Sequence, residues 1–418
     1  MLTPSDFSLF TFTFFFQMPF LKKLSLVVFV FSFLFQPSLA QKNVKKDIAQ
    51  AQAFIKSRKN LDKAEQLMRK LLTDSANQHN IKIYVVLTEA LRAQYEQGNE
   101  KMYLRQKVDT AAIFNLAKRM FDACEQLDSL DMLPDEKGRV KMKYRERNAN
   151  YLHRYRRNLF NGGLWFIGKQ KYPDALTFLG KYYDCHRKPL YTSLHYTPDS
   201  VAAYWALFSA YKLGDAHKSL CYGEVARKDS AHLEYTLQYL AEAYFQLKDT
   251  AKYVATLHEG FYSYRKSDYF FTHLVDYYNQ RGLYHSSLDI VNTALQCQSD
   301  NAIMLYAKSN ILLNMGQYDE CIAVCEGLIA IDSLLSEAYY NAGAAWLNKA
   351  FEAEHADMKT AARRKYQEDC HRHALPYMER YRALRPDDKD KWAAALYNIY
   401  LNLNMGKQFE EIISIIRN

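Results

Sequence analysis

Four side-chain amides stand 34 residues apart in this 418-residue chain: Gln246, Gln280, Asn314 and Asn348. A side-chain amide is both a hydrogen-bond donor and an acceptor, so a row of amides on one surface can pair with the backbone of an extended peptide. The chain also holds 33 tyrosines, whose rings provide rigid contact area at a low cost in side-chain entropy. These residues indicate binding chemistry. The alternative is that the four positions are simply exposed and polar.

Two groups of cysteine and histidine side chains raise the question of a metal site. Cys321 and Cys325 stand four residues apart, and the run from Cys370 to His373 offers a thiol and two imidazoles. Residues 371 and 373 lie on different faces of a helix, so they cannot hold one ion unless the helix unwinds. We interpret Cys321 and Cys325 as small core residues. We therefore expect no metal site and no cofactor.

The common catalytic motifs are missing from the sequence. It has no glycine-rich phosphate loop between a strand and a helix, no G-x-S-x-G elbow and no H-E-x-x-H motif, since His258-Glu259 lacks the second histidine. We expect no catalytic residues, so the chain is predicted not to be an enzyme. An enzyme built on an unfamiliar buried acid or base is the third alternative.

The elements that must position these residues are predicted to be helices joined by short turns. Glycine (14 residues) and proline (9 residues) each stand below half of their usual share, which is about 7% and 5%. Both residues break helices, so their scarcity favours long helices. Five segments end a helix at residues 214, 248, 282, 316 and 350, in steps of 34. This period indicates repetition of one supersecondary unit.

The residues around this period resemble the tetratricopeptide repeat (TPR) family, whose unit is a helix-turn-helix of 34 residues. Tyr339, Gly343 and Trp346 resemble its first-helix signature, and residues 316–321 resemble its inter-helix turn. Small residues recur at repeat positions 8 and 20, where the two helices cross: Gly163, Ala175, Ser219, Ala241, Val275, Ser287, Ser309, Cys321, Gly343 and Ala374. Phe208 and Tyr253 are bulky at such positions, which predicts a shifted crossing in those units. The resemblance implies an all-α, right-handed superhelical α-solenoid of TPR helix-turn-helix units.

Four parts are predicted: a signal peptide (1–40), an N-terminal helical region with degenerate TPR-like units (41–155), the TPR array (156–388) and a closing helical pair (389–418). The array carries a loop insertion at 190–199 and a helical insertion at about 352–370. In the N-terminal region, two of the helices are predicted at 100–127 and 134–152. Terminal units of repeat arrays are expected to be atypical because they cap the core.

The first 40 residues have the pattern of a cleavable signal peptide that starts at Met18. Lys22 and Lys23 form its charged region, residues 24–35 are an apolar run of twelve, and Ala40 ends the small-residue cleavage site. Twelve residues are too few to cross a bilayer, since a spanning helix needs about 20. We therefore expect export to the periplasm or cell envelope of a bacterium, with no transmembrane segment in the mature chain.

The TPR resemblance implies that first helices line a concave face, with repeat positions 2, 5, 9, 12 and 13 pointing into it. The implied partner-binding groove consists of Tyr204, Tyr211, Tyr235, Gln238, Glu242, Gln246, Tyr269, Asp276, Asn279, Gln280, Tyr306, Asn310, Asn314, Tyr340 and Asn348. The basic residues with which one TPR subclass grips C-terminal carboxylates are missing from position 5. Glu242, Asp276 and Glu337 make the predicted groove neutral to acidic, which argues against a nucleic-acid ligand because phosphate binding needs positive charge.

The leading expectation is a non-enzymatic protein–protein interaction scaffold or adaptor in the bacterial envelope, with a peptide or helix in the groove. The alternative is an envelope component, peripheral to the membrane, that binds glycan or lipid headgroups through tyrosine and the basic stretch from Lys137 to Arg157. Attraction to charged headgroups weakens at high ionic strength, whereas tyrosine–amide contacts change little. The salt dependence of binding therefore distinguishes the headgroup alternative from the peptide-binding one. The net charge of +9 is otherwise consistent with solubility.

Overall fold

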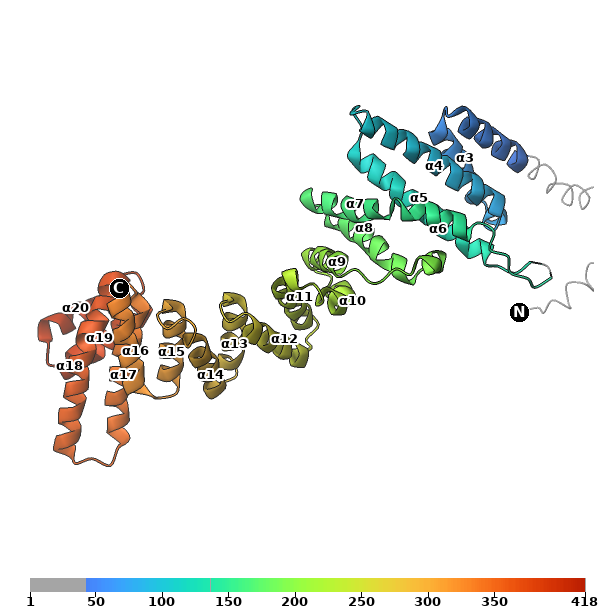
Figure 1. Cartoon of the computed structure of the whole chain (residues 1–418). Helices are drawn as coiled ribbons and strands as arrows, with labels where there is room; N and C mark the ends of the chain where they lie inside the picture. Colours follow the sequence, from blue (N-terminus) through green and yellow to red (C-terminus); the bar gives the residue numbers. More distant parts are fainter. Residues whose placement is uncertain (1–42, 136, 418) are drawn as a thin grey trace, which may run out of the picture. The chain divides into compact units, whose positions relative to one another are not determined.

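The computed structural model describes residues 43–135 and 137–417 (Figure 1). The predicted signal peptide lies outside these residues. The described part of the chain is built of α-helices, short 3-10 helices and connecting loops, and it contains no strand. It forms two compact units that divide between Leu213 and Gly214. The predicted fold class, an all-α solenoid of helix-turn-helix units, is confirmed.

The first unit begins with a helix at 43–57. Its later elements are α3 (Leu61–Leu72), η1 (Ser75–Asn77), α4 (Ile81–Tyr103), α5 (Thr110–Asp131), α6 (Arg145–His153), α7 (Arg156–Gly168), α8 (Tyr172–Asp184), η2 (Cys185–Arg187), η3 (Pro189–Leu194) and α9 (Ser200–Lys212). Consecutive helices pack together, as α3 does on α4, α4 on α5, α7 on α8 and α8 on α9. The predicted loop insertion at 190–199 contains most of η3, where Tyr191 is buried with its ring centroid 6.3 Å from that of Phe121.

The second unit is a series of helical hairpins. Its elements are α10 (Ala216–Ala226), η4 (Ser230–His232), α11 (Leu233–Gln246), α12 (Thr250–Ser263), α13 (Asp268–Asn279), α14 (Tyr284–Leu295), α15 (Ala302–Asn314), α16 (Tyr318–Ile331), α17 (Ser336–His355), α18 (Thr360–Leu384), α19 (Lys389–Asn402) and α20 (Gly406–Arg417). Each helix from α10 to α19 packs on the next one in the chain. The helices from α11 to α19 therefore bury apolar side chains against both of their neighbours in sequence.

The 34-residue period reappears in the backbone where first helices end. Gly214, Gly282 and Gly316 have left-handed φ angles of +68°, +67° and +74°, and Lys248 has +59°. Glycine suits this conformation because it has no Cβ, and the left-handed residue lets the last carbonyls of the helix accept hydrogen bonds. Ala350 occupies the fifth such position without this cap, and α17 continues past it.

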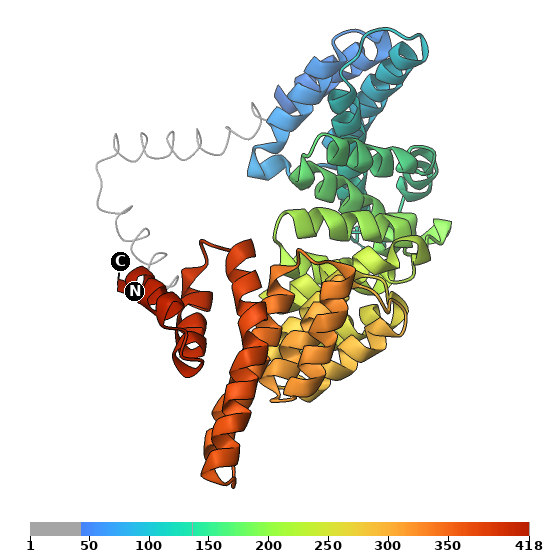
Figure 2. The same cartoon turned by 90° about the vertical axis from the view of Figure 1, so that its left-hand side faces the viewer.

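The continuation of α17 forms a long hairpin with α18. This hairpin extends beyond the neighbouring helices α15 and α16 (Figures 1 and 2). The predicted helical insertion at about 352–370 spans the end of α17, a connection at 356–359 and the start of α18. Among the described residues, no helix combines the length and the apolar character that crossing a bilayer requires.

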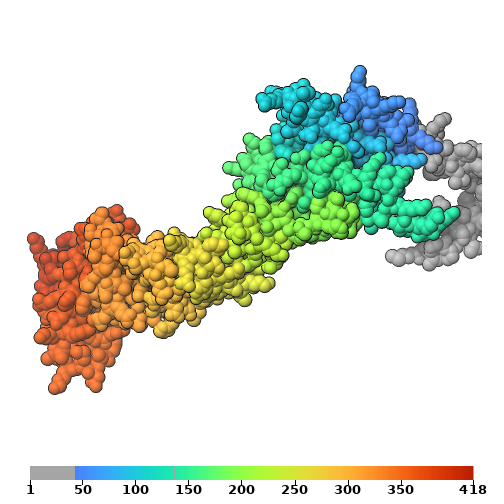
Figure 3. Space-filling model, in the orientation of Figure 1, coloured from blue at the N-terminus to red at the C-terminus, as the bar shows by residue number. Residues whose placement is uncertain are grey.

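Two helices of the N-terminal region differ from the prediction. The helix predicted at 100–127 is wrong, because α4 runs to Tyr103 and a loop separates it from α5. The helix predicted at 134–152 is also wrong, since only α6 is helical there. The Asp135 carboxylate accepts hydrogen bonds from the backbone N–H of Lys137 and Arg139 at 2.9 Å, which closes a turn in place of a helix. The loop between α5 and α6, drawn in teal, stands out from the helices of its unit (Figure 3).

The cysteine pair in the array has the predicted core role. Cys321 and Cys325 are fully buried, and the Cys321 thiol donates to the backbone carbonyl of Ser309 at 3.2 Å. Ser309 and Cys321 occupy positions 8 and 20 of one repeat, so the two helices meet there as predicted. The Ser309 hydroxyl accepts a hydrogen bond from the buried Asn341 amide at 3.0 Å, which ties that repeat to the next one.

Candidate partner-binding groove

Two consecutive first helices, α11 and α13, present the same pair of residue types. Glu242 and Gln246 stand one turn apart on α11, and the Gln246 amide donates to the Glu242 carboxylate at 3.0 Å. Asp276 and Gln280 stand at the equivalent positions, 34 residues later, on α13 and at its C-cap. Residues four apart lie on the same face of a helix, so each helix carries a carboxylate and an amide side by side.

A groove of about 680 Å³ lies against these two helices and the start of α12. It is lined by Glu242, Phe245, Gln246, Lys248, Thr250, Tyr253, His273, Asp276, Tyr277, Gln280 and Arg281. We call it the α11–α13 groove. The predicted partner-binding residues Glu242, Gln246, Asp276 and Gln280 are thus brought together around one hollow.

Three aromatic rings line the same groove. The Tyr253 ring lies between Phe245 and Tyr277, with centroid distances of 5.3 and 6.4 Å. Phe245 is 61% exposed, whereas Tyr253 is buried at the base. Aromatic faces next to polar groups provide the contact area and the orientation that peptide recognition uses.

The charges around the groove are balanced. Burial raises the pKa of Tyr253, and the nearby carboxylates of Glu242 and Asp276 raise it further, because they disfavour a phenolate beside them. Lys248 and Arg281 supply two cations, and the Arg281 guanidinium lies 3.8 Å from the centroid of the Tyr277 ring. The lining is neutral in sum, which suits an uncharged peptide backbone.

The four amides of the predicted row are all exposed. Asn314 on α15 makes a similar side-chain contact, since its amide donates to the side-chain oxygen of Asn310 at 3.1 Å, and it also donates to the Asn310 backbone carbonyl at 2.7 Å. Asn348 stands on α17, whose next turns form the long hairpin. Of the four amides, only Gln246 and Gln280 line the α11–α13 groove.

The other predicted groove residues of the second unit lie in varied environments. Tyr235 is exposed on α11, and the half-buried Tyr269 donates its hydroxyl to the Gln238 carbonyl at 3.3 Å. Tyr340 is half-buried, with its ring centroid 5.2 Å from that of Tyr381. Half-buried positions are also held by Asn279, Tyr306 and Asn310. The half-buried side chains among them offer a partner less of their surface than the exposed Gln246 and Gln280.

Two predicted groove residues belong to the first unit. Tyr204 and Tyr211 lie on α9, where Tyr204 is only 5% exposed and Tyr211 is half-buried. The α11–α13 groove is formed without them.

The groove also holds five residues that were not predicted for it: Phe245, Lys248, Tyr253, Tyr277 and Arg281. Tyr253 belongs to a second helix, α12, whereas the family register selects residues of first helices. The sequence feature that could have indicated Tyr253 was its large side chain at repeat position 20. A large ring at this helix crossing reaches the groove base, where other repeats hold the smaller Ser287 and Cys321.

The histidines of the Cys370–His373 run serve their own helix. The Nδ1 atoms of His371 and His373 each donate to the carbonyl four residues earlier, at 2.7 Å. The His373 ring also stacks on Trp346, with centroids 4.5 Å apart. Cys370 is buried on α18. These contacts account for the three side chains as parts of the α17–α18 packing.

No protein-family model and no curated protein sequence matches the chain. Among solved structures it is similar to YrrB, described as a TPR protein with an unusual peptide-binding site, at 13% identity and a TM-score of 0.33, over 45% of this chain and 88% of that one. It is similar to a TPR protein from Parabacteroides merdae at 15% identity and a TM-score of 0.31, over 71% and 96%. It is similar to a TPR protein (BF2334) from Bacteroides fragilis at 19% identity and a TM-score of 0.31, over 60% and 98%. Similarity of this degree carries no argument about function.

Proposed function

We propose that this chain is an exported, non-enzymatic TPR scaffold or adaptor of the bacterial envelope that binds an extended segment of another protein in the α11–α13 groove. The observation that carries the proposal is the pairing, on two consecutive first helices, of an exposed amide with a carboxylate around one aromatic-lined hollow. Export rests on the predicted signal peptide alone.

The groove has suitable groups for main-chain recognition. Gln246 and Gln280 each offer a donor and an acceptor, and Glu242 and Asp276 accept hydrogen bonds from peptide N–H groups. Phe245 and Tyr277 provide apolar contact for the side chains of the bound segment. Because the lining is neutral in sum, binding of this kind depends weakly on ionic strength.

A phage-displayed library of random peptides tests the proposal with a defined ligand set. Selection on the wild-type protein is compared with selection on a Phe245→Ala/Gln280→Ala variant, which removes one exposed ring and one exposed amide of the groove. A Phe351→Ala/Gln296→Ala variant is the matched control, because both of its side chains are exposed in the second unit and outside the groove.

We expect the same peptides to be enriched on the wild type and on the control. Their affinity for the groove variant should be at least roughly tenfold weaker, as hot-spot truncations typically show. Circular dichroism and thermal melting establish that the variants are folded. Enrichment that is equal on all three proteins would place recognition elsewhere and contradict the groove proposal.

A second candidate function is binding of anionic headgroups by the loop between α5 and α6. The later part of the predicted basic stretch is engaged within the first unit, since Arg145 donates to Asp128 at 2.7 and 2.8 Å. The loop, in contrast, exposes the apolar Leu133, Val140 and Met142 next to several lysines. Apolar tips flanked by cations favour an anionic membrane surface. Co-sedimentation with phosphatidylserine vesicles at low salt, lost at high salt, supports this candidate; no sedimentation at low salt contradicts it.

A further inference from the structure

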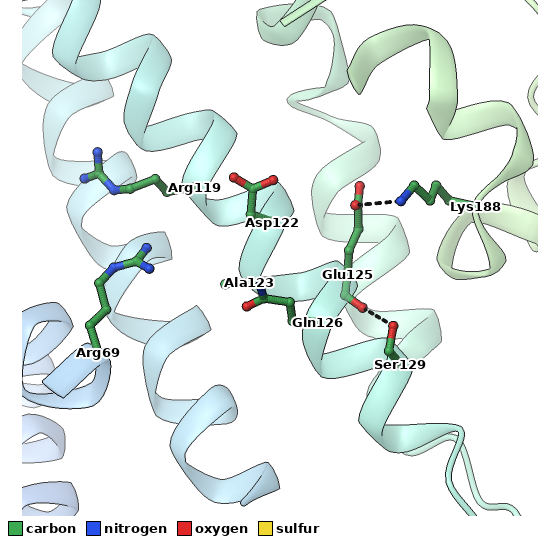
Figure 4. Close-up of a pocket in the computed structure, with 8 residues that line it drawn as sticks. All are labelled: Arg69, Arg119, Asp122, Ala123, Glu125, Gln126, Ser129 and Lys188. Carbon is green, nitrogen blue, oxygen red and sulfur yellow. Dashed lines mark hydrogen bonds and ion pairs between the residues drawn. The ribbon is translucent and has the colours of Figure 1, made fainter. Parts of the chain in front are cut away.

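The first unit contains a second cavity, of about 380 Å³, whose lining is almost wholly polar or charged. It is lined by Arg69, Arg119, Asp122, Ala123, Glu125, Gln126, Ser129 and Lys188 (Figure 4). Its volume falls in the range of small-molecule sites, roughly 300–1,000 Å³. None of its residues belongs to the α11–α13 groove.

The two arginines of this cavity share a buried carboxylate. Glu65 is 7% exposed and accepts hydrogen bonds from Nε of Arg69 at 2.8 Å, Nε of Arg119 at 2.9 Å and the Gln94 amide at 2.9 Å. Burial acts to raise the pKa of Glu65, but these hydrogen bonds outweigh it and the pKa is lowered. A guanidinium has five N–H donors, so each arginine keeps donors that Glu65 does not use.

The two carboxylates that line the cavity are already neutralised by lysines. The Lys181 ammonium lies 2.7 Å from Asp122 and 3.1 Å from Glu125. Lys118 lies 3.2 Å from Asp122, and Lys188 lies 3.4 Å from Glu125. Asp122 and Glu125 are thus paired with lysines, and the two arginines share the single negative charge of Glu65.

The ion pairs of this cluster join five cationic side chains to three carboxylates, which leaves an excess of two positive charges. Arg69 and Arg119 approach from α3 and α5 on one side of the cavity, and Lys188 approaches from the segment after η2 on the other (Figure 4). Arg69, Arg119, Lys188, Asp122 and Glu125 line the cavity, and the other charged groups of the cluster stand behind them. A positive excess at and beside a hollow is electrostatically complementary to an anion.

We propose that this cavity binds a phosphate dianion, either free or as the phosphate group of a monoester. Arginine donors match phosphate oxygens in pairs, and Lys188 adds a mobile point charge. Gln126 and Ser129 provide uncharged polar groups in the same lining. The proposal is independent of the α11–α13 groove, because it rests on different residues and a different ligand.

Isothermal titration calorimetry of the purified protein with sodium phosphate tests the proposal, at constant ionic strength maintained with sodium chloride. Lys188→Gln removes a lining cation that is 44% exposed and makes one long ion pair, so the fold is expected to survive. Arg69→Gln removes a lining guanidinium and keeps a donor for Glu65. Lys218→Gln is the control, since it removes one exposed cation of the second unit and changes the net charge equally.

We expect saturable phosphate binding to the wild type and to the control. Each cavity variant is expected to weaken it roughly tenfold, the effect of losing one charge-assisted hydrogen bond. Absence of saturable binding to the wild type overturns the proposal. Equal affinity of the wild type and the folded Lys188→Gln variant overturns it as well, whatever the behaviour of Arg69→Gln.

A parallel titration with glycerol 1-phosphate distinguishes the two sources of the group. Tighter binding of the monoester than of inorganic phosphate identifies an esterified ligand, and the reverse order identifies free phosphate. Whichever ligand binds more tightly, the site is supported if Lys188→Gln weakens binding of that ligand. The site is contradicted if Lys188→Gln leaves the binding unchanged.

Discussion

Gly163 on α7 and Leu179 on α8 lie so close that a Cβ added to Gly163 would stand 2.4 Å from the Leu179 Cγ atom. The same relationship recurs in the second unit, where a Cβ on Gly343 would stand 2.9 Å from the Met378 side chain. Both glycines occupy repeat position 8, so the closeness of paired helices depends on the absence of a single methyl group.

Gly163→Ala is expected to lower the free energy of unfolding by about 1–3 kcal/mol, because the new methyl group must displace Leu179 from a packed interface. Urea denaturation measures the change. Gly168→Ala, at the end of the same helix, is the control, since no atom outside its immediate surroundings lies within 4 Å of the added Cβ. That substitution is expected to be neutral or slightly stabilising, as alanine favours the helix. Equal losses from both substitutions would contradict the packing argument.

Glu65→Gln is expected to destabilise the protein by about 2–3 kcal/mol at pH 7, because the neutral amide replaces a carboxylate that accepts from two arginines. The folded-state pKa of Glu65 lies below its ordinary value of 4.5. Its stabilising contribution is therefore complete above that value and declines as the pH falls through the folded-state pKa. The difference in unfolding free energy between the wild type and the variant should therefore become smaller as the pH is lowered below about 5.

The control for this pH series is Glu100→Gln, which changes an exposed carboxylate on α4. Its stability should follow that of the wild type within about 0.5 kcal/mol at every pH. A Glu65→Gln gap that stays constant from neutral to acid pH would mean that the Glu65 charge makes no contribution.

The buried pair Ser309 and Asn341 is expected to be coupled. Asn341→Ala should cost about 1–3 kcal/mol, because it removes the donor to Ser309 and opens a small cavity. Ser309→Ala should also destabilise, since it leaves the Asn341 amide without that acceptor. A double-mutant cycle by urea denaturation should give a double variant less destabilised than the sum of the two single ones. The exposed amide Asn314, changed to alanine, should stay within about 0.5 kcal/mol of the wild type. Strict additivity would contradict the coupling.

The seven cysteines are expected to fall into two reactivity classes. Cys221 and Cys297 are exposed, whereas Cys124, Cys185, Cys321, Cys325 and Cys370 are buried. Burial raises the pKa of Cys124 to about 12 and that of Cys185 to about 11, so at neutral pH the reactive thiolate is scarce at both. Titration with Ellman's reagent should detect two thiols rapidly in the native protein and seven after denaturation. Rapid native labelling of more than two would contradict the assigned burial.

The period and the helical class followed from sequence because their causes are local. Gly214, Gly282 and Gly316 mark helix ends because a left-handed cap favours glycine, and Ala350 shows how the helix continues when that cap is missing. The errors in the N-terminal region were also local. The Asp135 turn replaced a predicted helix, since side-chain hydrogen bonds to the backbone compete with helix formation and leave no periodic signal.

The sequence by itself determined the repeat, the small residues at the helix crossings and the outward position of the amides. Only the tertiary structure decided which side chains share a hollow: Tyr253 enters the α11–α13 groove from a second helix, and Tyr204 is buried. It also brought Arg69, Arg119 and Lys188 around one cavity. Backbone hydrogen bonds of a helix join residues one turn apart, so they leave a regular pattern in the sequence. A cavity depends on side chains from elements far apart in the chain, and their packing leaves no such pattern.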